Sequence, residues 1–312
     1  MKKKSKRYKI FLGIVGFLVL LTGILIIYAT KVYFDIKSAA DQSYAKVERT
    51  SKYKYHVNSK KQEPFSVLLL GVDTGDFGRT EQGRSDSIMV ATVNPEKEKT
   101  TLISIPRDTY TEISGKNRSD KINHAYAYGG VAMSIATVEK LLDIPIDYYV
   151  EINMKGIQQL IDAVGGVEVN NPFTFTYEGK EFKIGKLKLN GTDALKYSRM
   201  RYEDPKGDYG RQNRQRQVVS GIIEQLKSIH TLTNYNHLLT ILGDNTKTDI
   251  SWKMIESLVK NYRPAFTTVK TDQLTGEGFT GDGTVGEQGI SYQKVSSNEL
   301  KRVQEELKGQ LK

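Results

Sequence analysis

The hydrophobic pattern of the chain changes abruptly near its beginning. An unbroken apolar run extends from Ile10 to about Ala29, roughly the 20 residues that a helix needs to cross a bilayer. The first nine residues carry six positive charges, which keep that end of the chain in the cytoplasm. A cleaved signal peptide is the alternative, but its apolar region is usually about 7–15 residues long. The pattern therefore predicts a cytoplasmic basic segment over 1–9 and an uncleaved transmembrane helix over 10–29.

A polar, charged segment follows the apolar run. Residues 30–64 contain few core-forming residues and end in the sequence KKQEP, so we predict an extracytoplasmic stalk, with room for one short helix. The globular domain is predicted over 65–312. The sequence motifs lie within residues 65–226, and residues 227–312 complete the domain at its C-terminal side.

Strand and helix patterns alternate in the globular region. Short apolar or alternating runs bounded by Gly, Asp, Asn and Pro predict strands at 65–72, 87–94, 101–105 and 266–274. Helical spacing is found at 131–142, 154–164, 193–199, 208–229, 251–262 and from about 297. The pair Gly165 and Gly166 predicts a helix end, and the glycine-rich stretch 276–289 a flexible loop. Such a succession predicts an α/β domain with a mixed central β-sheet sandwiched by helices.

The charge balance limits the range of partners. The chain has 312 residues and a net charge of +10, but without the six N-terminal charges 40 basic residues face 36 acidic ones. The basicity of the domain is therefore local, which argues against a nucleic-acid partner. The chain contains no cysteine, so disulfides and thiolate chemistry are excluded.

Polar side chains gather at the ends of the predicted strands. Asp73 follows the first strand, Arg84 and Asp86 precede the second, and Arg107 with Asp108 follows the third. Strand ends are where sheet enzymes collect functional residues. Two carboxylates from neighbouring strands suit Mg²⁺, which leaves coordination positions open for phosphate oxygens. The alternative is that Asp73 caps a turn and Asp86 pairs with Arg84.

The segment 199–217, RMRYEDPKGDYGRQNRQRQ, is rich in arginine and almost free of apolar residues. Guanidinium groups match phosphate oxygens two at a time. Arg199 and Arg201 would face the same side of an extended chain. Arg211 and Gln215 share a face near a helix start, where the helix dipole favours an anion. The segment therefore predicts an anion site.

Two further arginines in this segment are interpreted differently. Arg214 is predicted to share the face of Arg211, whereas Arg216 and Gln212 point elsewhere. Arg216 is expected to lie on a solvated polar face. The four histidines have no metal-ligand spacing, and the sequence lacks a G-x-S-x-G motif. A zinc site and a serine nucleophile are therefore disfavoured, and His124 is expected to be structural.

Six motifs, taken together, resemble the LytR-CpsA-Psr family over roughly Phe65 to Leu226. They are GVD at 71–73, GRSDS at 83–87, SIPRDTY at 104–110, DKINHAYAYGG at 120–130, DAVGGVEV at 162–169 and the segment 199–217. The resemblance implies a membrane-anchored, outward-facing phosphotransferase of Gram-positive bacteria. Such an enzyme moves an anionic glycopolymer, typically wall teichoic acid, from a polyprenyl-pyrophosphate carrier to peptidoglycan.

The resemblance also implies roles for individual residues. Asp73 and Asp86 would serve Mg²⁺. The pyrophosphate would be held by Arg84, Arg107, Arg199, Arg201, Asp208, Arg211 and Gln215. The predicted catalytic residues are Asp73, Asp86, Arg107, Arg199 and Arg201. The lipid chain is expected in an apolar groove between sheet and helices, because a polyprenyl tail is strongly disfavoured in water.

Two other functions remain open at this point. Family members have been labelled membrane-bound transcriptional attenuators or regulators, and a wall-polymer binding protein without catalysis is a third possibility. A regulator needs its basic face in the cytoplasm, whereas the lysine-rich start places the arginines outside. The prediction is therefore a single-pass type II protein of the cell membrane with an extracytoplasmic catalytic domain.

Overall fold

The centre of the molecule is a mixed β-sheet. A computed structural model describes residues 6–49, 53, 57–73, 83–226, 241, 243–283 and 288–312, without the side chains of 6–20, 24, 25 and 226. The sheet has six strands in the order β11-β6-β1-β2-β3-β12. Strand β1 runs parallel to β6 and β3 parallel to β12, while the other neighbours are antiparallel. The predicted α/β class with a mixed central sheet is confirmed.

The elements have the following bounds. The strands of the central sheet are β1 (Phe65–Val72), β2 (Ser85–Asn94), β3 (Lys99–Ile105), β6 (Tyr148–Asn153), β11 (Thr246–Thr248) and β12 (Thr268–Gln273). Paired strands outside it are β4 (Tyr110–Ile113) with β5 (Arg118–Lys121), β7 (Val167–Asn171) with β10 (Gly185–Leu189), β8 (Phe175–Tyr177) with β9 (Lys180–Phe182), and β13 (Glu277–Gly281) with β14 (Ile290–Lys294). The helices are α1 (Lys6–Ser43), α2 (His124–Leu142), α3 (Met154–Ala163), α4 (Gly191–Arg199), α5 (Asp208–Leu226), α8 (Trp252–Asn261) and α9 (Ser297–Gln310), with 3₁₀ helices η1 (Ser59–Lys61) and η3 (Arg263–Phe266).

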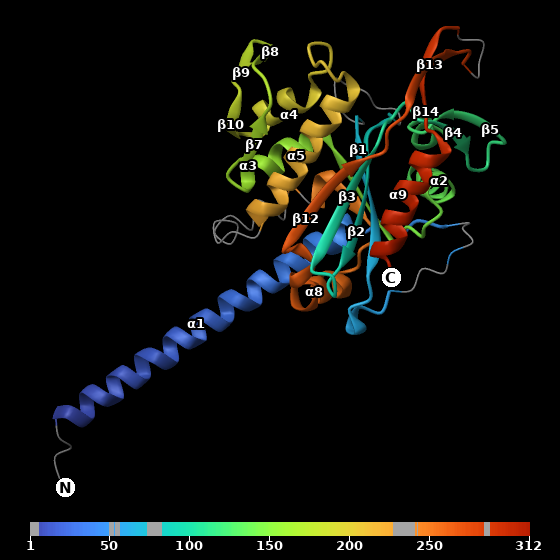
Figure 1. Cartoon of the computed structure of the whole chain (residues 1–312). Helices are drawn as coiled ribbons and strands as arrows, with labels where there is room; N and C mark the ends of the chain where they lie inside the picture. The colour runs from blue at the N-terminus through green and yellow to red at the C-terminus, as the bar shows by residue number, and fades with distance from the viewer. Residues whose placement is uncertain are drawn as a thin grey trace.

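Helices cover both faces of the sheet (Figure 1). The alternation of side chains along β1 places Leu68 and Leu70 in one apolar cluster and Phe65 and Val67 in another. The first cluster is closed by α2 and α9, and the second by α8, η3 and Val219 of α5. The sandwich that the alternating pattern predicts is therefore present.

A smaller unit of α3, α4, α5 and the strands β7 to β10 lies beside the sheet (Figure 1). The predicted helix end at Gly165 and Gly166 is confirmed, since both glycines have positive φ, +85° and +91°, between α3 and β7. A Cβ at Gly166 would lie 2.8 Å from the carbonyl oxygen of Leu189. Only glycine fits this turn without displacing β10.

A buried arginine connects α4 and α5 through an ion pair and hydrogen bonds. Arg214 is 1% exposed at its side chain and pairs with Asp204, which lies in the loop between the two helices. Its Nε donates to the carbonyl of Tyr197 at 2.9 Å, and its Nη2 donates to that of Met200. A Cβ at Gly210 would lie 1.9 Å from Asp204 Oδ2, so the helix can approach the loop only because this residue is glycine. The prediction that Arg214 shares the anion face was wrong, because the apolar cluster encloses it.

The first helix is longer than the predicted membrane span. Helix α1 runs from Lys6 to Ser43 and projects away from the domain (Figure 1). No helix formed by the described residues has a stretch long and apolar enough to span a bilayer. Much of the predicted span over 10–29 consists of side chains outside the described part of the chain.

Two segments differ in detail from the sequence expectations. Within the predicted stalk, Tyr44 bridges to Thr248, and Arg49 forms an ion pair with Asp249, so the chain after α1 is attached to the domain. The predicted loop over 276–289 instead contains β13, which pairs antiparallel with β14 directly after it. Its residues 284–287 lie outside the described part. Glycine content alone predicted a loop, but Phe279 and Tyr292 stack across the two strands.

We expect replacement of Asp204 by Ala to destabilise the domain by about 3–5 kcal/mol, because it leaves the Arg214 cation buried and unpaired. Urea denaturation measures this change. Lys180→Gln is the control, since it removes an exposed partner of Asp193 and should cost less than about 1 kcal/mol. An Asp204→Ala variant as stable as wild type would contradict the structural role of this pair.

Candidate active site

The ends of three adjacent strands bring the first group of polar side chains together. Strand β1 ends at Val72, and the antiparallel strand β2 begins beside it, with a register shift between Gly71 and Val72. At this irregularity the Arg84 amide donates to Asp73 Oδ1 at 2.7 Å. The expected alternative for Asp73, a turn contact, is therefore present, while Asp86 pairs with another arginine. A bulge at a strand end re-aims the following side chain, here that of Asp73.

Arg107 connects the strand ends. It follows β3 through Pro106, and its Nη1 donates to Asp86 Oδ1 at 2.6 Å. Its Nε lies 4.0 Å from Asp108 Oδ2, and Asp108 Oδ1 accepts from Lys121 Nζ at 2.8 Å. Two cations and two carboxylates thus alternate along this edge of the sheet.

The start of α5 supplies the second group. Asp208, the first residue of the helix, is 6% exposed and lies 2.5 Å from Arg211 Nη2 through its Oδ1. The same oxygen lies 3.6 Å from Arg201 Nε, and Oδ2 accepts from Gln212 Nε2 at 2.8 Å. An aspartate in the first turn is favoured by the helix dipole. One carboxylate therefore orients two arginines at the positive end of α5.

Electrostatic coupling joins the two groups into one site. Burial lowers the pKa of Arg107, but Asp86 and further carboxylates, with Asp208 among them, raise it overall. Burial lowers the pKa of Arg211, and the neighbouring cations Arg107 and Arg201 lower it further, against the effect of Asp208. Because such effects fall off with distance, the end of β3 and the start of α5 face the same space. The guanidinium groups of Arg107, Arg201 and Arg211 lie around this space, which suits a multiply charged anion.

The other predicted residues surround this group with differing contacts. Arg199 is the last residue of α4 and is partly buried, and Arg201 follows one residue later. The predicted extended stretch is limited to Met200 between them, whose φ and ψ are −56° and 132°. Gln215 is partly buried one turn beyond Arg211, and Arg84 is exposed.

Two polar residues at the site, Lys121 and Gln212, were not predicted as site residues. Asp108 was placed beside Arg107 at the strand end but was given no role. Gln212 was expected to point elsewhere, and that expectation was wrong, because its side chain bonds to Asp208. Gln212 could have been found, because it lies four residues after Asp208 on one helix face. Lys121 carries no local signal, since the β4–β5 pair folds it back onto Asp108. Tyr209 was also missed, and its hydroxyl bonds to Gly276 and to Gln293 Oε1, both at 2.8 Å.

A buried network supports Lys121. Asp120 is 1% exposed and accepts from the hydroxyl of Tyr128 at 2.7 Å. Its Oδ2 also lies 2.9 Å from His124 Nδ1, which agrees with the structural role expected for this histidine. Burial raises the pKa of Asp120, but the contact with His124 and the hydrogen bonds from Tyr128 and the Lys121 backbone amide lower it overall.

The residues at the strand ends offer oxygen donors, which are the type that a hard divalent cation prefers. The described residues include no group of three His, Cys, Asp or Glu side chains arranged to hold a metal ion. Mg²⁺ commonly uses one or two carboxylates and takes its other oxygens from water and phosphate. Asp73 and Asp86 lie at adjoining strand ends and provide such a pair. They are compatible with Mg²⁺, and their role as its ligands stays a prediction.

Comparison with known sequences covers nearly the whole chain. Residues 30–309 match the LytR_cpsA_psr family. A protein of Enterococcus faecalis named polyisoprenyl-teichoic acid–peptidoglycan teichoic acid transferase TagU is 52% identical over 307 residues, which cover 98% of this chain and 99% of that one. The protein of the same name from Bacillus subtilis is 39% identical over 310 residues, with 99% and 97% covered.

Solved structures share the fold. The crystal structure of TagU from B. subtilis is similar with a TM-score of 0.63 and 40% identity, covering 80% of this chain and 97% of that one. A structure described as TagT bound to LIIa-WTA has a TM-score of 0.69 and 33% identity, with 86% and 98% covered. A chain from E. faecalis described as a transcriptional regulator has a TM-score of 0.71 and 45% identity, with 82% and 90% covered.

We predict that Asp120→Asn lowers the stability at neutral pH and that its difference from wild type shrinks on acidification. The pKa of Asp120 is lowered in the folded state, so its contribution is present above the unfolded-state pKa, about 3.9, and is lost as the pH falls through the folded-state pKa. Urea denaturation between pH 7 and pH 3 measures the difference. Glu112→Gln, at an exposed ion pair, is the control. A difference that is independent of pH would contradict the prediction.

Proposed function

Because the chain belongs to the LytR-CpsA-Psr family, we propose that it transfers an anionic glycopolymer of the wall teichoic acid type from a polyprenyl-pyrophosphate carrier to a peptidoglycan hydroxyl. The observation that carries this proposal is the meeting of Arg107 at a strand end with the Asp208, Arg201 and Arg211 group at the start of α5. The names of the relatives agree with it, since they describe teichoic acid transfer to peptidoglycan.

The reaction needs alignment more than a nucleophile from the protein. The oxygen of the acceptor hydroxyl attacks the phosphorus attached to the glycopolymer. The bond from this phosphorus to the bridging oxygen breaks, and polyprenyl monophosphate leaves with the bond's electron pair. The hydroxyl proton passes to a base, and a phosphodiester now joins polymer and peptidoglycan. Such transfers depend mainly on positioning and on charge stabilisation in the transition state.

The arginines supply that charge stabilisation. Arg201 and Arg211 are oriented by one carboxylate, and Arg107 by Asp86, so their guanidinium groups are held before the donor arrives. Preorganised donors are more effective than mobile ones, because no reorganisation is needed during the reaction. Lys121, held by Asp108, adds a further cation beside Arg107. Arg84, Arg199 and Gln215 complete the proposed pyrophosphate site.

Magnesium completes the proposed site. We assign Asp73 and Asp86 as its ligands, because they offer oxygen donors at adjoining strand ends. The ion would neutralise phosphate charge. A carboxylate at this position could accept the acceptor proton only where it is not fully committed to the metal.

The proposed location follows from the N-terminal pattern. Six positive charges precede the apolar run from Ile10 to Ala29, so we propose a single-pass type II membrane protein with residues 65–312 outside the cell membrane. This location suits peptidoglycan as acceptor. It does not suit a transcriptional regulator, the second function considered, because a regulator must reach DNA in the cytoplasm.

We expect Arg107→Gln and Arg201→Gln to lower kcat/KM for polymer transfer by about 10²–10³-fold, because each removes a preorganised donor for developing negative charge. The assay measures transfer from a purified lipid-linked donor to peptidoglycan with Mg²⁺. Chelation of the metal should abolish transfer, and added Mg²⁺ should restore it.

Arg263→Gln is the matched control, since Arg263 is exposed on η3 and away from the site. Full activity of both site variants would refute the proposed transfer site. A protein that binds polymer but transfers none, with Mg²⁺ and a proper donor present, would instead be the non-catalytic binding protein.

The proposed orientation predicts that protease added to intact protoplasts digests residues 65–312. The positive N-terminal flank directs the rest of the chain outward. Immunoblotting with an antibody against the C-terminal helix α9 follows the digestion, and a cytoplasmic protein serves as the integrity control. Protection of the domain in intact protoplasts would contradict the orientation.

A further inference from the structure

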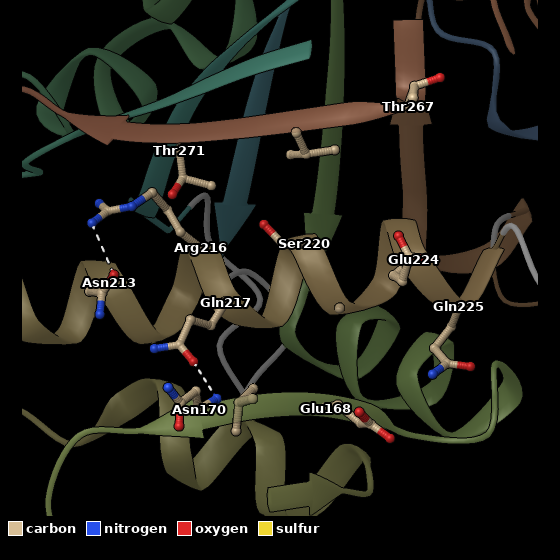
Figure 2. A pocket seen from close by; sticks show the side chains of 13 residues that line it. Glu168, Asn170, Asn213, Arg216, Gln217, Ser220, Glu224, Gln225, Thr267 and Thr271 are labelled. Atoms are coloured by element: carbon tan, nitrogen blue, oxygen red, sulfur yellow. Dashed lines mark hydrogen bonds between the residues drawn. The ribbon is translucent and has the colours of Figure 1, made fainter. Parts of the chain in front are cut away.

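A polar cavity of ≈ 440 Å³ lies between α5, β7 and β12, outside the group of residues assigned to the reaction (Figure 2). We call it the α5–β12 cavity. Ten of its 13 lining residues are polar or charged, and the apolar ones are limited to Val169 and Val269 beside Gly221. A hydrocarbon chain would leave these polar side chains without hydrogen-bond partners, so a polar ligand suits the cavity better than the lipid part of the donor does.

The cavity contains a buried cation that forms no ion pair with the described residues. Arg216 is 6% exposed, and its Nε and Nη1 have no hydrogen-bond partner among the described residues. Its Nη2 reaches only Asn213 Oδ1, at 3.4 Å. The carboxylate that acts on Arg216 is Asp272, which is already paired with Arg302 at 2.6 Å. Sequence reasoning placed Arg216 on a solvated face, and that expectation was wrong.

This arrangement costs folding free energy, which indicates a ligand. Burial lowers the pKa of Arg216 to about 10, so the guanidinium is still charged at neutral pH. A buried charge without partners is strongly unfavourable, and buried polar atoms are almost always satisfied. The hydroxyl of Ser220, one turn along the same wall, is also buried and has no hydrogen-bond partner in the described part of the chain. Both residues line a space in which an anion with hydrogen-bonding groups would satisfy them.

The charges of the cavity are divided between its two ends. Figure 2 shows Arg216 and Asn213 toward one end, and Glu168 and Glu224 toward the other. Gln217 lies between them, oriented by the Asn170 amide that donates to its Oε1 at 2.7 Å. A polyanion would meet repulsion at the glutamate end. A ligand with an anion and a cation separated by amide groups matches both ends and the wall between them.

We propose that the α5–β12 cavity binds a short peptide, with a free carboxylate on Arg216 and a free ammonium group at Glu168 and Glu224. The inference rests on the proposed function, in which the acceptor is peptidoglycan, a glycan that bears short peptides with both groups. Arg216 follows Arg211 by five residues on α5, about 7.5 Å along the helix axis. A peptide held here keeps the sugar to which it is attached near the pyrophosphate site. The acceptor hydroxyl of the glycan is thereby aligned.

Calorimetric titration of the full-length protein in detergent tests the proposal with three probes. They are a peptidoglycan disaccharide that carries its peptide, the same disaccharide without peptide, and a glycerol phosphate oligomer. Wild type should bind the peptide-bearing disaccharide the most tightly. Arg216→Gln should weaken this binding about 10-fold or more, because a charge-assisted contact is lost. Glu168→Gln should weaken it a few-fold, and the control Arg263→Gln should leave it unchanged.

Thermal unfolding separates binding from a structural role. Arg216→Gln removes an uncompensated buried cation, so its Tm should equal or exceed that of wild type. A lowered Tm, or equal binding of all three probes, would overturn the proposal. Arg216-dependent binding of the glycerol phosphate oligomer alone would also overturn it, because the cavity would then serve the donor polymer. A wild type that binds the peptide but transfers no polymer would refute the proposed function and leave this site standing.

Discussion

The arrangement of the site depends on one carboxylate at the first turn of α5. Asp208 lies against both Arg201 and Arg211, and it influences Arg107 across the gap to the sheet. Without a fixed anion at this point, three guanidinium groups would repel one another in a partly buried space. The helix dipole and Gln212 hold that anion in place. A site for a multiply charged substrate can therefore be assembled before the substrate arrives.

A second arginine–carboxylate pair serves the fold alone. Arg214 and Asp204 are enclosed by the rings of Phe175 and Tyr197, with the guanidinium carbon 5.4 Å and 5.8 Å from the two ring centres. Three arginines of one helix thus have three different environments. Arg211 faces the proposed substrate space, Arg214 lies in the apolar cluster, and Arg216 lines the α5–β12 cavity.

The sequence could predict what depends on short-range order. Strand boundaries near Asp73, Asp86 and Arg107 followed from alternation and turn residues, and adjacent strands then bring their ends together. The surroundings of Arg214 and Arg216 could not be predicted in this way. A helical repeat gives the angle of a side chain around its axis, but the walls on each side come from β7, β12 and the aromatic cluster, which are distant in sequence. Lys121 was missed for the same reason, because its contact with Asp108 depends on how the β4–β5 pair folds back.

The contacts between α1 and the domain determine the orientation of the active site relative to the helix. Tyr33 of α1 packs edge-on against Trp252 and bonds to Glu256 at 3.1 Å, and Gln42 bonds to Asp244 at 2.9 Å. The 38-residue helix is about 57 Å long and continues into these contacts without a break. The helix is therefore a rigid connection to the domain and not a flexible linker. A change in the tilt of α1 therefore changes the position of the sheet edge that carries the site. The orientation of the domain relative to the surface that holds the N-terminus depends on the angle of this helix.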